Sequence, residues 1–326
     1  MNLIALYDTL SISDNDSKVF NAIPIPEYPE FRIAIDFEGN ALLLLSVNKR
    51  IKDISLKNFR LKYLQLEQNV ECKILENNTS RLQTFTIITF RSADRNLQEY
   101  FLRISETLVK AIGKNPTQQQ VIDSLKRFVE VFKALTDIPT KTVNGLWAEL
   151  FLIDNAKNPQ KLLNYWHSIP EEKFDFNAGA EKVEVKSNSN FERKHVFSSE
   201  QLNPPANTQV LIASVFVKQH NSGINIQQLI DSISNKVGSD YTLTEKLSSI
   251  VCKTLANSLE HSIGVKFDYE IARQSLQFYR HQDIDKIEKI HIPENISEVR
   301  YKSDLTELMP ISPTAIKSNG LLFDSL

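Results

Sequence analysis

The chain reads Phe174-Asp175-Phe176, then six residues that include Gly179, and then Val183-Glu184-Val185-Lys186-Ser187. Both segments have the apolar spacing of short β-strands, and the glycine favours a turn between them. Side chains alternate across a strand, so Glu184 and Lys186 share one face. If the two segments pair as a hairpin, Asp175, Glu184 and Lys186 converge.

The converging carboxylates need a positive partner. Two acidic groups held close together repel each other, and the pKa of one of them rises unless a cation joins them. Lys186 neutralises Asp175 and Glu184 less well than a divalent metal ion does, so the arrangement predicts bound Mg²⁺. The alternative is a surface hairpin with a ladder of Glu184 and Lys186, in which both charges are solvated and contribute little.

A further carboxylate lies upstream, in a segment predicted to be a helix from about Val143 to Asn155. Leu146, Leu150 and Ile153 define one helical face by their spacing, and Glu149 falls on that face. A glutamate among large apolar residues is costly unless it is paired, protonated or bound to a metal. The alternative is a glutamate at the edge of the apolar stripe that reaches solvent.

Together, Glu149 on a helix, Asp175 on a strand and Glu184-Val185-Lys186 on the next strand resemble the PD-(D/E)XK superfamily, which has the fold of the type II restriction endonucleases. The resemblance covers roughly residues 143–230. Phe174 stands where the motif has proline, which supplies backbone geometry and no ligand atom. The chain looks most like the bacterial PD-(D/E)XK motif proteins, through five stretches: Gly145–Leu150, Phe197–Leu202, Phe278–Arg280, Ile292-Pro293 and Val299–Tyr301.

The resemblance implies hydrolysis of a phosphodiester by metal-activated water. Asp175 and Glu184 would hold Mg²⁺, with Mn²⁺ as the alternative metal, and Glu149 would complete the metal shell directly or through water. The backbone carbonyl of Val185 would be a further ligand. Two more residues are given roles by the resemblance: Lys186 would orient the water and stabilise negative charge on the phosphate, and Gln201 would support the lysine or the nucleophilic water.

Other polar residues near the hairpin have competing interpretations. The basic residues Arg193, Lys194 and His195 are expected to contact phosphates, and the alternative is a solvated loop. The segment around Ser199 and Gln201 is expected to open a helix beside the site. His167, which follows Trp166, is expected to have a structural role.

The remaining chain predicts a mixed α and β protein. Strand-like runs with a tight-turn signal predict an antiparallel β module, and two amphipathic segments predict helices that connect it to the second half. The fold class is therefore α+β or α/β: an N-terminal β module, helices, and a restriction-endonuclease-like core with a mixed central sheet flanked by helices. We predict a β-rich domain over residues 1–95, a helical connector over 96–140, and a nuclease-like domain with a C-terminal extension over 141–326. The predicted strands of the module are Arg32–Phe37, Ala41–Val47, Phe59–Leu66 and Thr84–Phe90, and the helices are Leu97–Ile112 and Gln118–Leu135.

Composition limits the functional classes. The 326 residues carry a formal net charge of -2, so nucleic-acid binding would need a local basic patch rather than a global field. No secretion signal is evident, the apolar runs are too short to span a bilayer, and Cys72 and Cys252 make no disulfide framework. A cytoplasmic protein without a membrane partner is expected.

Three functions remain in competition. The first is a Mg²⁺-dependent DNA endonuclease of a restriction or phage-defence system, whose β module serves recognition or docking. The second keeps the fold but makes the protein a non-catalytic DNA-binding or assembly subunit of a defence complex. The third is a two-domain interaction protein in which the four charged residues are incidental. Cleavage of both DNA strands usually needs two active sites, so a homodimer or other restriction or defence subunits are expected as partners.

Overall fold

The structure is a computed structural model in which the chain forms two compact units. The first unit comprises Met1–Pro139 and Thr244–Glu260, and the second comprises Thr140–Leu243 and His261–Leu326. The three-part division expected from the sequence stays a prediction. Val47, at the end of a predicted strand, lies outside the described residues. The structure describes residues 1–12, 20–46, 58–76, 79–114, 116–137, 139, 141–168, 173–238, 240–316 and 322–326.

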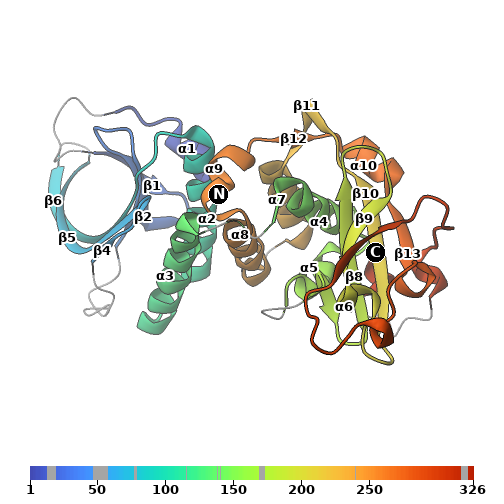
Figure 1. Ribbon diagram of the computed structural model, residues 1–326. Helices are drawn as coiled ribbons and strands as arrows, with labels where there is room; N and C mark the ends of the chain where they lie inside the picture. Colours follow the sequence, from blue (N-terminus) through green and yellow to red (C-terminus); the bar gives the residue numbers. More distant parts are fainter. Residues whose placement is uncertain are drawn as a thin grey trace. The chain divides into compact units, whose positions relative to one another are not determined.

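The first unit contains an antiparallel sheet with the strand order β1-β2-β3-β6-β5-β4. Its long strands β5 and β6 are strongly curved (Figure 1). The predicted strand Phe59–Leu66 is wrong, because the chain turns after β4 and the Leu61 N–H bonds the Leu64 carbonyl at 2.7 Å. The strands are β1 Asn21–Ile25, β2 Tyr28–Ile35, β3 Ala41–Leu45, β4 Phe59–Arg60, β5 Leu64–Glu76 and β6 Thr79–Phe90.

Helices of the first unit pack through an aromatic cluster formed by Phe90, Phe101, Phe128 and Phe132. The two predicted amphipathic helices are present, and each begins at a side-chain cap that accepts an otherwise unpaired backbone N–H. The elements are α1 Leu3–Tyr7, α2 Arg95–Ile112, α3 Gln118–Lys133, the 3₁₀ turns η1 Ala134–Thr136 and η2 Ala256–Ser258, and most of α8 Tyr241–Leu255; α9 Leu259–Ser262 crosses into the second unit.

The second unit is built around a mixed sheet with the order β13-β10-β8-β7, in which only β8 and β10 are parallel among the pairs of this sheet in the described chain. Helix α4 contacts β8, α5 and α7 (Figure 1). This mixed sheet with flanking helices confirms the predicted α+β class. The strands are β7 Phe176–Ala178, β8 Glu181–Asn188, β10 Gln209–Phe216 and β13 Gln277–Arg280, and the helices are α4 Val143–Asn155, α5 Pro159–Tyr165, α7 Ile226–Val237 and α10 Tyr269–Ser275.

Two small ribbons complete the second unit. Strand β9 (Lys194–Ser198) pairs antiparallel with β14 (Arg300–Asp304), and β11 (Gln219–Asn225) pairs with β12 (Lys266–Phe267). The short helix α6 (Ser199–Leu202) follows β9 directly. One face of the β9–β14 ribbon packs on a buried cluster that includes Phe174, Phe197, Ile212, Tyr279 and Leu305. The ribbon thereby brings the C-terminal part of the chain next to the hairpin. In the part of the chain that the structure describes, no helix is long and apolar enough to cross a membrane.

Candidate active site

The predicted hairpin is present. Strands β7 and β8 pair antiparallel with Phe176 opposite Val183, and the turn between them contains Gly179 at φ +73°. This left-handed conformation favours glycine. Glu184 and Lys186 lie on β8 as predicted, whereas Asp175 lies directly before β7 and not within a strand. The hairpin therefore presents Asp175 at the end of one strand and Glu184 along its neighbour.

Helix α4 holds Glu149 in a buried position. The helix has the predicted bounds, and its residues from Leu146 to Asp154 are all buried. Glu149 itself is only 2% exposed, so it does not reach solvent from the edge of the apolar stripe. Its Oε2 accepts a hydrogen bond from Trp166 Nε1 at 2.8 Å and lies 2.9 Å from His167 Nε2. A buried carboxylate with this many partners is held in one orientation.

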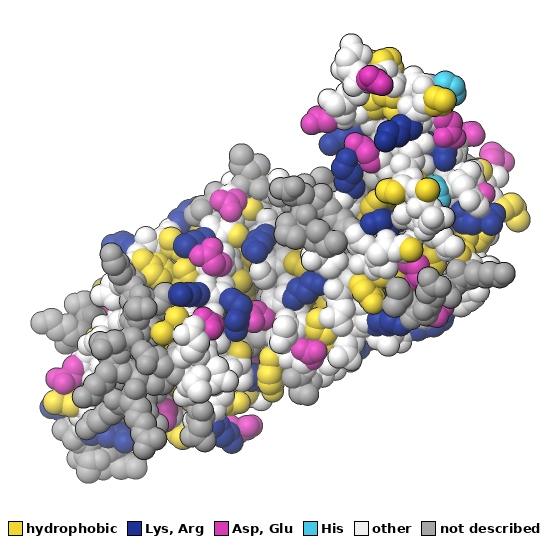
Figure 2. All heavy atoms as spheres, turned by 90° about the horizontal axis from the view of Figure 1, so that it is seen from below, with side chains coloured by type: hydrophobic (Ala, Val, Ile, Leu, Met, Phe, Trp, Pro, Cys, Tyr) yellow, Lys and Arg dark blue, Asp and Glu magenta, His cyan; other side chains and the backbone are white. Residues whose placement is uncertain are grey.

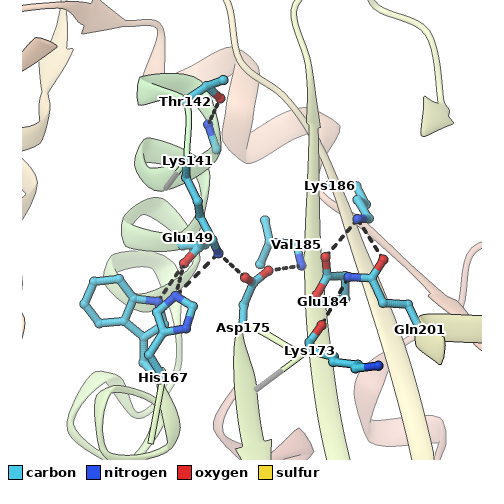
Figure 3. Close-up of polar contacts among 12 residues, drawn as sticks. Lys141, Thr142, Glu149, His167, Lys173, Asp175, Glu184, Val185, Lys186 and Gln201 are labelled. Carbon is cyan, nitrogen blue, oxygen red and sulfur yellow. Dashed lines mark hydrogen bonds and ion pairs between the residues drawn. The ribbon is translucent and has the colours of Figure 1, made fainter. Parts of the chain in front are cut away.

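A lysine joins the two buried carboxylates. Lys141 Nζ lies 2.5 Å from Glu149 Oε1, contacts Asp175 Oδ1, and lies 3.4 Å from His167 Nε2. The other oxygen of Asp175 accepts a hydrogen bond from the Val185 N–H at 2.8 Å. Figure 3 shows these groups in a row from α4 across Asp175 to β8. We name Lys141, Glu149, His167 and Asp175 the Lys141 cluster.

A second lysine occupies the other end of the row. Lys186 Nζ lies 2.8 Å from Glu184 Oε1 and donates a hydrogen bond to Gln201 Oε1 at 3.1 Å. Gln201 is fixed in turn, because its Oε1 also accepts from the Ser198 N–H and its Nε2 donates to the Lys173 carbonyl, both at 3.1 Å. We name Glu184, Lys186 and Gln201 the Lys186 cluster (Figure 3).

Charges in the Lys141 cluster stabilise one another. Burial by itself lowers the pKa of the Lys141 ammonium, but the negative charges of Asp175 and Glu149 outweigh it and raise that pKa. Burial by itself raises the pKa of the Glu149 carboxyl, but the charge of Lys141 and the hydrogen bond with His167 bring it down to about 2. Glu149 and Lys141 are therefore an ion pair at neutral pH.

The two carboxyls of the hairpin behave differently. Burial, followed by the negative charge of Glu149, raises the pKa of Asp175 despite the contact with Lys141. Burial and the charge of Asp175 raise the pKa of Glu184 to about 8, although Lys186 opposes this. Buried carboxyls whose pKa values are raised by burial and by a neighbouring carboxylate form a site that lacks positive charge. A divalent cation is the group that would supply it.

The donor atoms fit a divalent cation. Glu149, His167 and Asp175 each offer one ligand atom, and these atoms all lie within 4.8 Å of one another. Carboxylate oxygens suit Mg²⁺ and Mn²⁺, and an imidazole nitrogen favours the transition metal. Glu184 lies outside this group of three and contacts Lys186 instead. The structure thus places Asp175 between two sets of partners, Glu149 on one side and the β8 residues on the other (Figure 3).

Sequence reasoning missed Lys141 and assigned His167 only a structural role. Lys141 directly precedes Thr142, whose side chain accepts a hydrogen bond from the Gly145 N–H and caps α4. No recognisable sequence motif around Lys141 indicates that its side chain contacts Glu149. His167 is positioned by its backbone, because its N–H bonds the Asp175 carbonyl at 2.9 Å. Neither position carries a local signal, since both depend on tertiary packing.

The expected phosphate contacts of Arg193 and His195 are wrong. Arg193 is buried, and its guanidinium donates to the Ser214 carbonyl and hydroxyl and to the Ser275 carbonyl. His195 is also buried, with Nε2 2.8 Å from the Ser214 hydroxyl, and burial lowers its pKa to about 4. Arg193, directly before β9, and His195, within it, hold this segment against β10 and are unavailable to a ligand. Of this basic segment, only Lys194 remains partly exposed.

The mixed sheet, the hairpin and the acidic residues define a protein of the restriction-endonuclease-like class. A family model described as "Putative PD-(D/E)XK family member, (DUF4420)" matches residues 3–306, and the chain belongs to this family. Membership points to a nuclease type of function and to the use of divalent metals. No curated protein and no solved structure matches the chain.

Proposed function

We propose that the protein is a nuclease that hydrolyses phosphodiester bonds of DNA with the help of Mg²⁺, for which Mn²⁺ can substitute. The observation that carries the proposal is the row of buried carboxylates Glu149, Asp175 and Glu184, which ends at Lys186. Membership of a PD-(D/E)XK family supports it. A buried row of acids stabilises a protein poorly, so its presence favours a functional role.

Following the resemblance, four groups would hold the cation: the carboxylates of Asp175, Glu184 and Glu149, and the carbonyl of Val185. The donor atoms that already lie within 4.8 Å of one another are those of Glu149, His167 and Asp175. The Val185 N–H points to Asp175, and the N–H and C=O of one strand residue point to the same side of the strand, so the carbonyl is directed toward the same edge. The chemistry that a bound cation supplies is to polarise a phosphate oxygen and to acidify an attacking water.

The protein's own side chains would neutralise negative charge on the phosphate and hold the active residues in position. Lys186 brings a positive charge next to Glu184, where it can stabilise negative charge on a phosphate or orient the attacking water. Gln201 holds the ammonium of Lys186 in place. Trp166 and His167 fix the orientation of Glu149, which is the role of supporting residues around a metal ligand.

The biological setting extends the proposal. The resemblance to bacterial PD-(D/E)XK motif proteins favours a restriction or phage-defence system, in which DNA is the substrate and other defence subunits are partners. A second copy of the chain would supply the second active site that cleavage of both strands requires. A cytoplasmic location accords with this setting.

One observation favours a second candidate, a non-catalytic DNA-binding or assembly subunit. The Lys141 ammonium already bridges Glu149 and Asp175, which is the contact that a metal ion would make. Titration calorimetry with Mn²⁺ separates the candidates. A nuclease binds Mn²⁺ and loses this binding on Asp175→Ala, whereas a subunit with a purely structural cluster shows no binding in either form.

The decisive test is cleavage of duplex DNA with and without Mg²⁺. We expect Lys186→Ala to abolish metal-dependent cleavage while the protein stays folded. Lys182→Ala is the matched control, because Lys182 is on the same strand and the same face, away from Glu184 by two residues. Equal cleavage by wild type and Lys186→Ala would overturn the assignment of the site.

A further inference from the structure

A pocket of about 440 Å³ adjoins the Lys186 cluster. Its walls come from segments far apart in the sequence, namely β8, β9, α6 and the start of β14. Hydrogen bonds join these segments, since the Ser199 N–H bonds the Val299 carbonyl at 2.8 Å and Gln201 bonds Lys173 and Lys186. The pocket is thus a built part of the fold. It is lined by Lys173, Lys186, Val196, Ser198, Glu200, Gln201, Glu298 and Arg300.

The β9–β14 ribbon directs one of its faces into solvent. Ser198 pairs with Arg300, and Val196 pairs with Lys302. Paired residues of neighbouring strands lie on the same face, and these four are exposed or partly exposed, whereas the alternate residues such as Phe197 pack on the core. Arg300 therefore extends from the outer face of the ribbon, next to Ser198, where it lines the pocket.

The cations of the pocket differ in their partners. Lys173 pairs with Glu200 at 2.7 Å, and Lys186 contacts Glu184. Arg300 makes no ion pair or hydrogen bond through its side chain with any residue that the structure describes. An exposed guanidinium without a protein partner presents its planar fork of donors, which matches the geometry of a phosphate.

The positive charge of Arg300 matters because the protein as a whole has no excess of positive charge. On the face drawn in Figure 2, Lys and Arg side chains are interspersed with Asp and Glu side chains. The net charge of -2 gives no general attraction for nucleic acid. Binding of a polyanion therefore depends on local groups such as those of the pocket.

We propose that this pocket binds a backbone phosphate of the nucleic-acid strand adjacent to the phosphate that is hydrolysed, and that Arg300 is its phosphate-binding residue. The inference rests on the proposed nuclease function and assigns a substrate subsite to it. Lys186 connects the two positions, because it contacts Glu184 and also lines the pocket. A strand whose reacting phosphate lies at Lys186 has its neighbouring phosphate within the pocket.

Two acidic residues also line the pocket. Glu200 is neutralised by Lys173, which leaves Glu298 as the exposed carboxylate at the pocket. Glu298 has φ +57°, a conformation that costs a non-glycine residue energy and is enriched at functional sites. Its negative charge repels phosphate, so we expect a phosphate in the pocket to bind on the side of Arg300.

Binding without cleavage tests the proposal. Fluorescence anisotropy in EDTA measures the affinity for labelled duplex DNA and for duplex RNA of the same sequence. We expect Arg300→Ala to weaken binding of the substrate roughly tenfold and to reduce the slope of log affinity against log salt by about one. Lys302→Ala is the control, because Lys302 lies on the same strand and the same face but outside the pocket. Melting temperatures check that both variants fold.

A methylphosphonate scan locates the phosphate. One uncharged linkage is placed at each position around the cleavage site, and affinities are measured for the wild type and for both variants. At the phosphate next to the cleaved one, the substitution should weaken binding by wild type and by Lys302→Ala but not by Arg300→Ala. Two results would overturn the pocket. In the first, the uncharged linkage weakens binding by Arg300→Ala as much as binding by wild type at every position; in the second, the two variants have equal affinities. Cleavage by the wild type would in either case still support the nuclease function. Absence of any binding to DNA and RNA would overturn the nuclease proposal and the pocket together.

Discussion

Lys141 and Lys186 both contact buried carboxyls of the second unit, but they are bound very differently. Lys141 is held by two carboxylates, and Glu149, with a pKa of about 2, is fully charged at neutral pH. Lys186 contacts Glu184, whose pKa of about 8 leaves it mostly protonated, and a neutral amide from Gln201. The first lysine is therefore committed to its partners, whereas the second keeps most of its charge for a ligand.

The two lysines also differ in what lies beside them. The partners of Lys141 belong to a hydrogen-bonded network in which Trp166 and His167 also contact Glu149. Lys186 lies 5.1 Å from the centre of the Phe197 ring and lines an open pocket. Under the proposed nuclease function, we therefore assign Lys141 the role of an internal counter-ion and Lys186 the role of a group that faces the substrate.

The largest expected effects are on the free energy of unfolding, when the ammonium group of Lys141 or of Lys186 is removed, and the two effects should be unequal. Lys141→Met leaves two buried carboxylates without a cation, so we expect the free energy of unfolding to fall by about 3 kcal/mol in EDTA. Lys186→Met should cost about 1 kcal/mol, because its partner is largely neutral. Urea denaturation followed by tryptophan fluorescence measures both, since the chain's two tryptophans, Trp147 and Trp166, lie in the second unit. Equal losses would show that the two lysines are equivalent.

Glu184 and Glu149 should contribute opposite pH dependences to the stability of the metal-free protein. The raised pKa of Glu184 gives stability that is complete below its unfolded pKa of 4.5 and is lost as the pH rises through about 8. The lowered pKa of Glu149 gives stability that is present above pH 4.5 and is lost as the pH falls through about 2. Of these two changes in stability, only that of Glu184 falls within the range between pH 5 and 8.5.

Glu184→Gln should remove that change. Relative to wild type, we expect the variant to gain about 4 kcal/mol in the free energy of unfolding as the pH rises from 5 to 8.5. Glu200→Gln is the control, because its pairing with Lys173 lowers the pKa of Glu200 and keeps it charged throughout this range. Urea titrations at four pH values give the comparison. A difference that stays constant with pH would mean that Glu184 is charged in the folded protein.

Elements of the fold could be predicted where the sequence pattern that specifies them lies within one segment of the chain. The bounds of α4 matched the prediction, because periodic apolar residues specify a helix within a single segment. The break between β4 and β5 was missed, since the turn around Leu61 contains neither glycine nor proline. Pairing of β9 with β14 joins segments about one hundred residues apart, and no local pattern encodes it.

The candidate site shows the same division. Glu184, Lys186 and Glu149 were recognisable from strand alternation and from a charge on an apolar helix face. Lys141 and His167 reach Glu149 only through tertiary packing, so the cation of the cluster was invisible in the sequence. The prediction that Arg193 contacts phosphate was wrong because its partner is also distant in the sequence. The guanidinium donates to the Ser214 carbonyl in β10, a strand that follows later in the chain.

Metal affinity should reveal whether Lys141 competes with the cation. Its ammonium contacts Glu149 Oε1 and Asp175 Oδ1, which are oxygens that a metal would use. We expect Lys141→Met to bind Mn²⁺ about tenfold more tightly than wild type, and its stability to recover on adding Mn²⁺. Titration calorimetry measures the affinity, with Lys186→Met as the comparison, which should change little. Weaker binding by Lys141→Met would instead make the lysine a support of the metal site.

The smallest effect is expected at Gln201, which holds Lys186 from α6. Gln201→Ala removes the acceptor of the Lys186 ammonium and of the Ser198 N–H, so we expect losses of about 1 kcal/mol in stability and about fivefold in the cleavage rate at saturating DNA. Gln228→Ala is the matched control, because Gln228 makes the same backbone contact at the start of α7, to the Asn225 N–H. It should lose similar stability and no activity. If both variants cleave at the wild-type rate, Gln201 only caps its helix, and the position of Lys186 is set by Glu184 alone.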